Sequence, residues 1–131
     1  MIKVPVKTSS RTELLDITSR IQSLLEENNY ADGVLTLFVP HTTAAITINE
    51  GADPDVKRDM LFEVNKVIPF EDGYHHMEGN SAAHIKTSLF GPSLQVIVED
   101  GRLQLGTWQS VYFAEFDGPR QRKLWLKWSG D

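Results

Sequence analysis

The sequence contains no cysteine, and this absence removes several kinds of chemistry. Disulfide bonds and thiolate ligands are excluded, so any bound metal ion must use histidine, carboxylate or carbonyl groups. No apolar run approaches the roughly 18 residues that a membrane-spanning helix requires, and residues 1–20 lack the pattern of a secretion signal. We therefore expect a cytoplasmic protein without a membrane partner.

Positive charge is also scarce relative to negative charge. The chain has 13 Lys and Arg against 18 Asp and Glu, a net charge of −5. This balance repels polyanions, so we expect no nucleic-acid partner. Because 40% of its 131 residues are hydrophobic and 24% are charged, the composition predicts one folded domain over residues 1–131 with a core of its own.

Short catalytic motifs of the common enzyme classes are missing as well. The chain has no GxSxG nucleophile turn, no phosphate-binding GxxxxGK loop, no GxGxxG and no HExxH. A serine next to a histidine occurs at His84–Ser88, but closeness in sequence does not make a catalytic triad. We therefore do not expect a serine hydrolase.

Helix caps and apolar periodicity predict three helices. Asp16 is the expected N-cap of a helix over residues 17–28. Asp53 followed by Pro54 is typical of the start of a second helix, which Pro69 ends. A third short helix is predicted from Ser81 to about residue 90, where Gly91-Pro92 closes it.

Alternating and apolar segments predict strands on both sides of these helices. The expected strands cover residues 2–8, 14–15, 34–39, 43–49, 93–99, 103–105, 107–116 and 123–128. Because helices and strands do not alternate regularly, the fold class predicted is α+β with a mostly antiparallel or mixed sheet. Trp108, Trp125 and Trp128 fall on the late strands, and we expect core or subunit contacts for them in preference to ligand stacking.

All four histidines lie between positions 41 and 84, among small polar and acidic residues. His84 is in the first turn of the third predicted helix, where the helix dipole disfavours imidazolium and so favours the neutral form that binds metals. With His41, His76 and the nearby Glu78 it predicts a site for a divalent ion such as Zn²⁺. Histidines that only hydrogen-bond to their own loops are the open alternative.

Four carboxylates crowd the segment that follows residue 49. Asp55 and Asp59 are one helical turn apart and face the same way, and such a pair can hold Mg²⁺ directly or through water. We predict Asn49, Glu50, Asp55 and Asp59 as catalytic residues, whereas Asp53 fits a helix cap better.

Distance separates this group from the histidines. An unbroken strand from His41 to Asn49 would span roughly 26 Å, at about 3.3 Å per residue. The strand is therefore interrupted, or the two groups form separate pockets, or a neighbouring subunit brings them together.

A third polar group follows the glycine at position 106. Thr107 and Gln109 are two residues apart and would share one side of a strand, and we predict that both bind substrate. Arg120 follows a glycine-containing turn and could bind a phosphate with two parallel hydrogen bonds. A solvent-exposed turn arginine is the alternative.

Taken together, these motifs resemble the YjbQ family nearly from end to end. The matching segments are Pro40-His41-Thr42-Thr43-Ala44-Ala45, Ile48-Asn49-Glu50, Asp53-Pro54-Asp55-Val56 with Asp59, Glu78-Gly79-Asn80, Ala83-His84-Ile85-Lys86, Gly91-Pro92-Ser93-Leu94, Gly106-Thr107-Trp108-Gln109 and Glu115 with Asp117-Gly118-Pro119-Arg120. The resemblance implies a compact α+β fold that assembles as a homotrimer, with a polar pocket near the subunit contacts. Either His75 or His76 can fill the family's histidine position, and His76 is preferred because it forms His-x-Glu-Gly.

The resemblance also implies a reaction, secondary thiamine-phosphate synthesis, which joins a pyrimidine-methyl diphosphate to a thiazole phosphate and releases diphosphate. Such chemistry needs Mg²⁺ and a cationic clamp, for which Asp53, Asp55 and Asp59 on one side and Lys86 and Arg120 on the other are the candidates. Neutral histidines instead favour a Zn²⁺-like ion. The leading hypothesis is a small metal-dependent trimeric enzyme acting on a small anionic or phosphorylated molecule. The alternative is a non-catalytic ligand-binding or regulatory trimer with a structural metal.

Overall fold

The alternating segments pair into two antiparallel sheets in the computed structural model, which describes residues 1–131. The larger sheet contains, in spatial order, β1 (Ile2–Lys7), β8 (Gln121–Gly130), β3 (Gly33–Phe38), β5 (Ser93–Glu99) and β6 (Arg102–Leu103). The smaller sheet contains β2 (Glu13–Asp16), β7 (Gln109–Glu115) and β4 (Ala44–Glu50). The expected α+β class is confirmed, with every strand pair antiparallel.

The three predicted helices are present: α1 (Thr18–Glu27), α2 (Pro54–Val67) and α3 (Ser81–Phe90). Asp53 caps α2 as expected, since its carboxylate accepts the backbone N–H of Asp55 at 2.9 Å. Helix α1 begins one residue later than predicted, so its N-cap is Ile17, which makes no side-chain cap, and Asp16 is not the N-cap. Asp16 instead accepts the N–H of Thr18 at 3.0 Å from the position before the cap. The local signal therefore holds at the start of α2 and is displaced by one residue at α1.

The predicted strand over residues 107–116 begins later than expected, at Gln109. Its first residues form a turn instead, in which the Gln109 side-chain oxygen accepts the N–H of Gly106 at 2.8 Å. Trp108 lies in this turn and is 63% exposed, so a core position for it is wrong. Trp128, by contrast, stacks on Tyr30 and packs against the core, and Trp125 stacks on Phe38.

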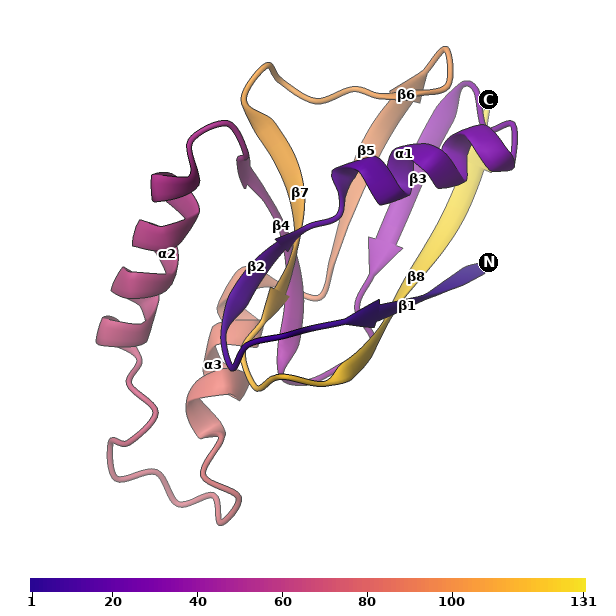
Figure 1. Ribbon diagram of the computed structural model, residues 1–131. Coiled ribbons are helices and arrows are strands. Elements are labelled where there is room, and N and C mark those ends of the chain that lie inside the picture. Colours follow the sequence, from indigo (N-terminus) through magenta and orange to yellow (C-terminus); the bar gives the residue numbers. More distant parts are fainter.

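The main core lies between the two sheets and extends under α1 (Figure 1). Strand alternation points Leu35 and Leu37 of β3 inward, and Leu124 and Leu126 of β8 meet them across the larger sheet. Ile21 of α1 and the inward residues of β4 and β7 close the same core. The larger sheet therefore has one covered and one open face.

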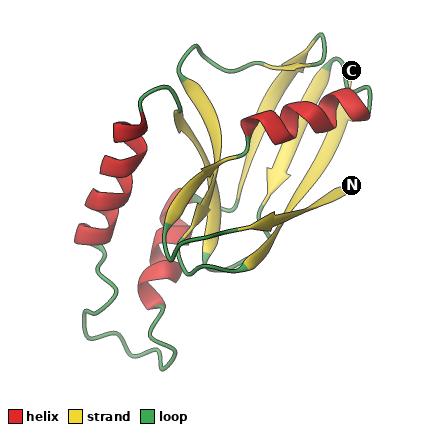
Figure 2. Ribbon diagram, in the orientation of Figure 1, coloured by secondary structure: helices red, strands yellow, loops and turns green.

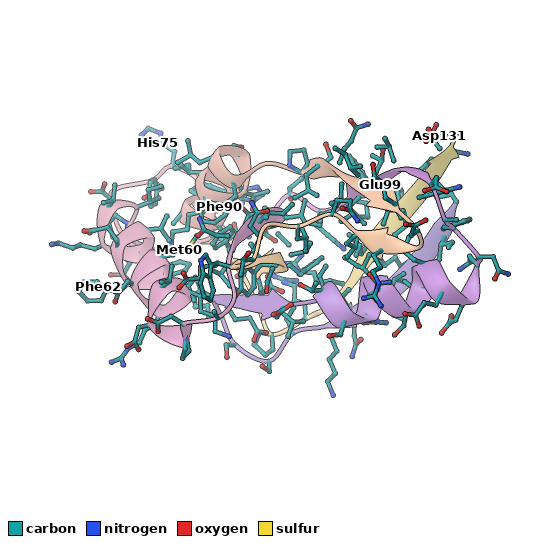
Figure 3. All side chains as sticks on the ribbon, turned by 90° about the horizontal axis from the view of Figure 1, so that it is seen from above. Met60, Phe62, His75, Phe90, Glu99 and Asp131 are labelled. Carbon is teal, nitrogen blue, oxygen red and sulfur yellow. The ribbon has the colours of Figure 1, made fainter.

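A second apolar cluster covers the outer face of the smaller sheet, where α2 and α3 gather on one side of the molecule (Figure 2). Small side chains make this possible: Ala45 and Ala114 from the sheet meet Ala83 of α3, and all three are fully buried. Helix α2 packs more loosely and has no fully buried residue. Met60 faces the body of the protein, whereas Phe62 projects away from it (Figure 3).

No helix in the chain combines the length and the apolarity needed to cross a bilayer.

Enlarging Ala83 tests how closely α3 approaches the sheet. We expect Ala83→Leu to lower the free energy of unfolding by about 1–3 kcal/mol, because the added methyl groups must displace Ala45 or Ala114. Ile85→Leu on the exposed side of the same helix is the matched control and is expected to change stability little. Urea denaturation followed by circular dichroism measures both, and an unchanged midpoint for Ala83→Leu would contradict the close packing.

Candidate functional site

The main hollow of the molecule is a cavity of about 630 Å³, here called the histidine cavity. It lies where the segment before β4, the start of α3 and the β7–β8 turn come together. It is lined by Phe38, Val39, Pro40, His41, Thr42, Thr43, Glu78, Asn80, His84, Pro92, Asp117, Arg120 and Arg122. The cavity thus gathers His41, His84 and Arg120, which are far apart in the sequence.

A buried ion pair forms the base of the histidine cavity. The guanidinium of Arg122 donates to both carboxylate oxygens of Glu115, with the Nε–Oε1 distance at 2.8 Å. Arg122 also donates to the Thr43 hydroxyl at 2.8 Å, and the Thr8 hydroxyl donates to Glu115 at 2.7 Å. Because both charged groups are buried and have several partners, the pair avoids the large cost of an unpaired buried charge.

The environment of Glu115 determines its protonation state. Burial by itself raises the pKa of this carboxyl group. Hydrogen bonds from Arg122, Thr8 and the Asp117 backbone N–H, together with the charge of Arg122, outweigh burial and place the pKa below the ordinary value of 4.5. Glu115 is therefore ionised at neutral pH and keeps Arg122 paired.

His41 enters the cavity with one ring nitrogen already engaged. Its Nε2 accepts the backbone N–H of Lys123 at 2.9 Å, so the neutral ring carries its proton on Nδ1. Burial, and then the positive charge of Arg122, lower its pKa, which keeps the ring neutral at pH 7. His41 thereby becomes a hydrogen-bond donor with no free lone pair for a metal ion, contrary to the expectation that it is a metal ligand.

Arg120 stands at the cavity with its direction fixed by Asp117. Its Nε donates to the Asp117 carbonyl oxygen at 2.7 Å and its Nη2 to the Asp117 carboxylate at 3.0 Å. The side-chain amide of Asn80 donates to the same carboxylate at 2.9 Å. The remaining N–H groups of the exposed guanidinium are free to bind an anion.

His76 and His84 form the other group at this site. Their rings meet edge to face with centroids 5.6 Å apart, and Nε2 of His76 is 3.9 Å from Oε2 of Glu78. His75, by contrast, projects away from the protein at the outer edge of the same loop (Figure 3). The structure thus brings His76, and not its neighbour, to His84.

No three His, Asp or Glu side chains of the chain stand close enough to form a ready-made metal site. His76 and His84 nevertheless place two imidazole rings edge to face, and the mostly exposed carboxylate of Glu78 lies near His76. These residues fit a Zn²⁺-like ion that completes its shell with further ligands.

The predicted carboxylate group does not reach the histidine cavity within one chain. Strand β4 is continuous from Ala44 to Glu50, so the strand is not interrupted, and within one chain the two groups lie in separate pockets. Asp55 and Asp59 line a shallow hollow on α2 with Arg58 and Phe62. A single bound ion cannot contact both these aspartates and His84 in one chain.

Asn49, Glu50 and Gln109 meet in a third hollow, beside Trp108 and Ile48. Thr107 lies exposed in the adjoining turn and shares no side of a strand with Gln109, because the strand starts only at Gln109. This part of the predicted substrate site thus exists as a group, but it lies at the far end of β4 from His41.

Lys86 is placed away from the cavity, so its expected contact with phosphate is not supported. It is two residues beyond His84, which turns it about 200° around the helix. Its buried ammonium group donates to Asn65 at 2.7 Å and lies 4.1 Å from the centre of the Phe70 ring. Burial and the nearby Arg11 lower its pKa to about 8.

The sequence interpretation did not assign Glu115 and Arg122 to the site, although strand periodicity indicates that both side chains point inward. Arg122 is in phase with the buried Leu124 and Leu126 on β8, and Glu115 is in phase with Val111 and Phe113 on β7. Opposite charges at inward positions of two strands joined by a turn indicate a buried ion pair. Asn80 and Asp117 have no comparable local signal.

The whole chain can also be compared with known proteins. The model of the family described as UPF0047 protein YjbQ-like matches residues 2–131. The chain belongs to the YjbQ (UPF0047) family. It is 53% identical to the UPF0047 protein YugU of Bacillus subtilis over 126 residues, which is 95% of this chain and 96% of YugU. It is 50% identical to a UPF0047 protein of Methanocaldococcus jannaschii, with 100% of this chain and 95% of the relative covered.

Solved structures of the YjbQ family share the fold. A crystal structure from Clostridium acetobutylicum, described as an uncharacterised conserved protein of this family, has a TM-score of 0.95 and 52% identity and covers 98% of this chain and 100% of its own. A conserved hypothetical protein from Thermus thermophilus has a TM-score of 0.93 and 40% identity over 98% of this chain and 100% of its own. YjbQ membership therefore establishes the fold, and the site geometry must carry the argument about activity.

Removing the charge of Glu115 tests the base of the cavity. Glu115→Gln leaves Arg122 buried without a counter-charge, and we expect the free energy of unfolding at pH 7 to fall by about 3–5 kcal/mol. In the wild-type protein the lowered pKa adds stability that is present above pH 4.5 and lost as the pH falls through the folded-state pKa. The variant should lack this part of the acid transition.

Thermal unfolding between pH 3 and pH 7 measures both effects. Glu99→Gln, at an exposed position of β5, is the control and should leave the profile unchanged. A wild-type acid profile retained by Glu115→Gln would show that the pair contributes nothing to the pH dependence.

Proposed function

We propose that the chain is a small metal-dependent enzyme that acts on an anionic, phosphorylated small molecule in the histidine cavity. One observation carries the proposal: a free guanidinium edge, a neutral imidazole N–H and His84, whose ring meets that of His76, lie at one cavity of about 630 Å³. Pockets of this size suit small-molecule ligands. A cytoplasmic location remains part of the proposal.

The preorganised donors of the cavity support binding of a phosphate. Arg120 is held in place by Asp117, so little side-chain entropy is lost when it binds an anion. The backbone N–H of Lys123 holds His41 through Nε2. The protonated Nδ1 of His41 is therefore available to donate a hydrogen bond to a ligand. The start of α3 at the same cavity adds the partial positive charge of a helix N-terminus.

His76 and His84, with Glu78, are the residues that would hold a divalent ion at this site. Such an ion would supply charge neutralisation for a departing diphosphate. The other candidate ligands, Asp55 and Asp59, would suit Mg²⁺. They line a separate hollow on α2, so no group of the histidine cavity can assist them within one chain. The imidazole pair favours a Zn²⁺-like ion instead.

We extend the proposal to a homotrimer with the cavity near a subunit contact. Phe38 lines the cavity and also lies on the open face of the larger sheet, where Ile97 is 59% exposed. On the same face, Trp125 keeps its indole N–H buried without an acceptor. Apolar side chains on an open sheet face next to a polar cavity are typical of surfaces that another subunit covers.

The reaction that we propose as a secondary activity is thiamine-phosphate synthesis. A carbon–nitrogen bond forms between the methylene group of the pyrimidine diphosphate and the thiazole nitrogen, and the carbon–oxygen bond breaks as diphosphate leaves with the electron pair. Arg120 would hold a phosphate group, and the His41 N–H would donate to a phosphate oxygen.

Metal analysis of histidine variants tests the ion. We expect about one divalent ion per wild-type chain, and His76→Ala and His84→Ala should each weaken metal binding by at least about tenfold. His75→Ala is the matched control, since this ring points away from the site. His41→Ala should keep the metal because its Nε2 is already occupied.

Elemental analysis after gel filtration gives the metal content, and sedimentation equilibrium of the same samples should show three chains per particle. Full metal occupancy in both His76→Ala and His84→Ala would mean that the proposed ligands are wrong.

Turnover of the two thiamine precursors by the metal-loaded protein tests the reaction. We expect diphosphate release, with KM raised about 10- to 100-fold in Arg120→Met, the cost of one charged hydrogen-bonding group. Arg102→Met, in β6 on another part of the surface, is the control. Phosphate binding without any turnover would instead support a ligand-binding or regulatory trimer.

A further inference from the structure

Aspartate is followed by glycine at four places in the chain, and the fold leaves only one of these pairs in an open loop. The pairs are Asp32-Gly33, Asp72-Gly73, Asp100-Gly101 and Asp117-Gly118. Such a pair is prone to rearrange, because glycine has no side chain to shield its amide nitrogen from the neighbouring carboxyl group. The folded structure decides which of the four nitrogens is free to react.

The fold holds the glycine of three of these pairs. The Gly101 N–H donates to the Ala31 carbonyl oxygen at 2.9 Å. The Gly118 N–H donates to the Arg11 carbonyl oxygen, also at 2.9 Å. Gly33 is buried as the first residue of β3, which lies between β8 and β5 in the larger sheet. A nitrogen that is hydrogen-bonded or packed inside a sheet is not free to turn toward the preceding carboxyl group.

Asp72 and Gly73 lie in a different environment. They form a bend in the segment between α2 and α3, which projects from the body of the protein (Figure 1), and both are exposed. No group of the chain accepts the Gly73 N–H, and none donates to the Asp72 carboxylate. A Cβ atom on Gly73 would meet nothing within 4 Å, so the bend has room to change its shape.

This bend lies between two anchored positions of the same segment. Before it, the centre of the Phe70 ring is 3.6 Å from the Arg11 guanidinium and 4.1 Å from the Lys86 ammonium group. After it, the His76 ring meets the ring of His84. A change in main-chain length at the bend must therefore move one of the two anchors. His76 is the one expected to move, because its side chain is 43% exposed whereas Lys86 is fully buried.

We propose that Asp72 is a site of spontaneous modification, where the chain rearranges to an isoaspartyl linkage that displaces His76 from His84. The Gly73 nitrogen attacks the side-chain carboxyl carbon of Asp72, and the carboxyl OH leaves as water with the amide proton. Water then opens the five-membered succinimide ring. When it breaks the bond between the nitrogen and the main-chain carbonyl carbon of Asp72, the chain runs through the former side chain and is one carbon longer. This rearrangement does not depend on the function proposed for the histidine cavity.

Ageing of the purified protein at pH 7 and 37 °C tests the proposal. An isoaspartyl methyltransferase with labelled S-adenosylmethionine marks the free α-carboxylate of the isoaspartyl product, and peptide mapping locates the label. We expect label to accumulate with time in the peptide that contains residue 72. The chain unfolded in guanidinium chloride should also acquire label in the peptides of the other three Asp-Gly pairs, because the fold no longer holds their glycines.

Variants distinguish position 72 from general ageing. Asp72→Glu keeps the charge but would have to close a less readily formed six-membered ring, so we expect it to lose nearly all of the label. Asp100→Glu removes a pair that the fold already protects and is the matched control, with labelling equal to that of the wild type. Asp72→Asn should accumulate label faster, because the same ring closure expels ammonia from an amide more readily than water from a carboxyl group.

Imidazole NMR signals of the aged protein test the displacement of His76. We expect a second set of His76 and His84 signals that grows in step with the label and is absent from Asp72→Glu. Label at residue 72 without new histidine signals would show that the longer chain leaves His76 in place. A folded protein that stays unlabelled at residue 72, while the unfolded chain acquires label there, would show that the bend is protected, and either result would overturn the proposal.

Discussion

The bidentate pair between Glu115 and Arg122 is the interaction on which the histidine cavity depends. It joins the last residue of β7 to the second residue of β8, and through Thr8 and Thr43 it also holds the ends of two other segments. Taking two charges out of water is costly, and only a complete set of hydrogen bonds offsets that cost. The same network holds the turn that carries Arg120, since the Thr8 hydroxyl accepts the Arg120 N–H, so stability and the anion binding that we propose would share one structural basis.

The length of β4 imposes the second constraint. This strand separates an end rich in histidine and arginine from an end with a tryptophan, two amides and a carboxylate. The two ends differ in charge, since Arg120 and Arg122 line the first and Glu50 is the only charged residue that lines the second. Within a single chain the two ends share no pocket, and in the trimer that we propose subunit packing would determine their separation.

Local signals predicted much of the fold because they act over only a few residues. Asp53 capped α2 because an aspartate before a proline satisfies the first free N–H groups of a helix whatever surrounds it. The strand expected from residue 107 failed for the opposite reason. Its residues have strand-forming side chains, but the side-chain oxygen of Gln109 accepts the backbone N–H of Gly106. This hydrogen bond closes a turn that contains Trp108.

The amino-acid sequence alone determined the α+β class, the three helices and the meeting of His76 with His84, since a short loop leading into one helix turn restricts where both rings can go. Only the tertiary structure decided the hydrogen-bond partners of His41 and Lys86. The backbone N–H that engages His41 belongs to a residue 82 positions away, and the partners of Lys86 depend on how α3 is turned against its neighbours. Hydrogen-bond partners that are far apart in the sequence leave no pattern in the residues next to either of them, so only the folded structure identifies them.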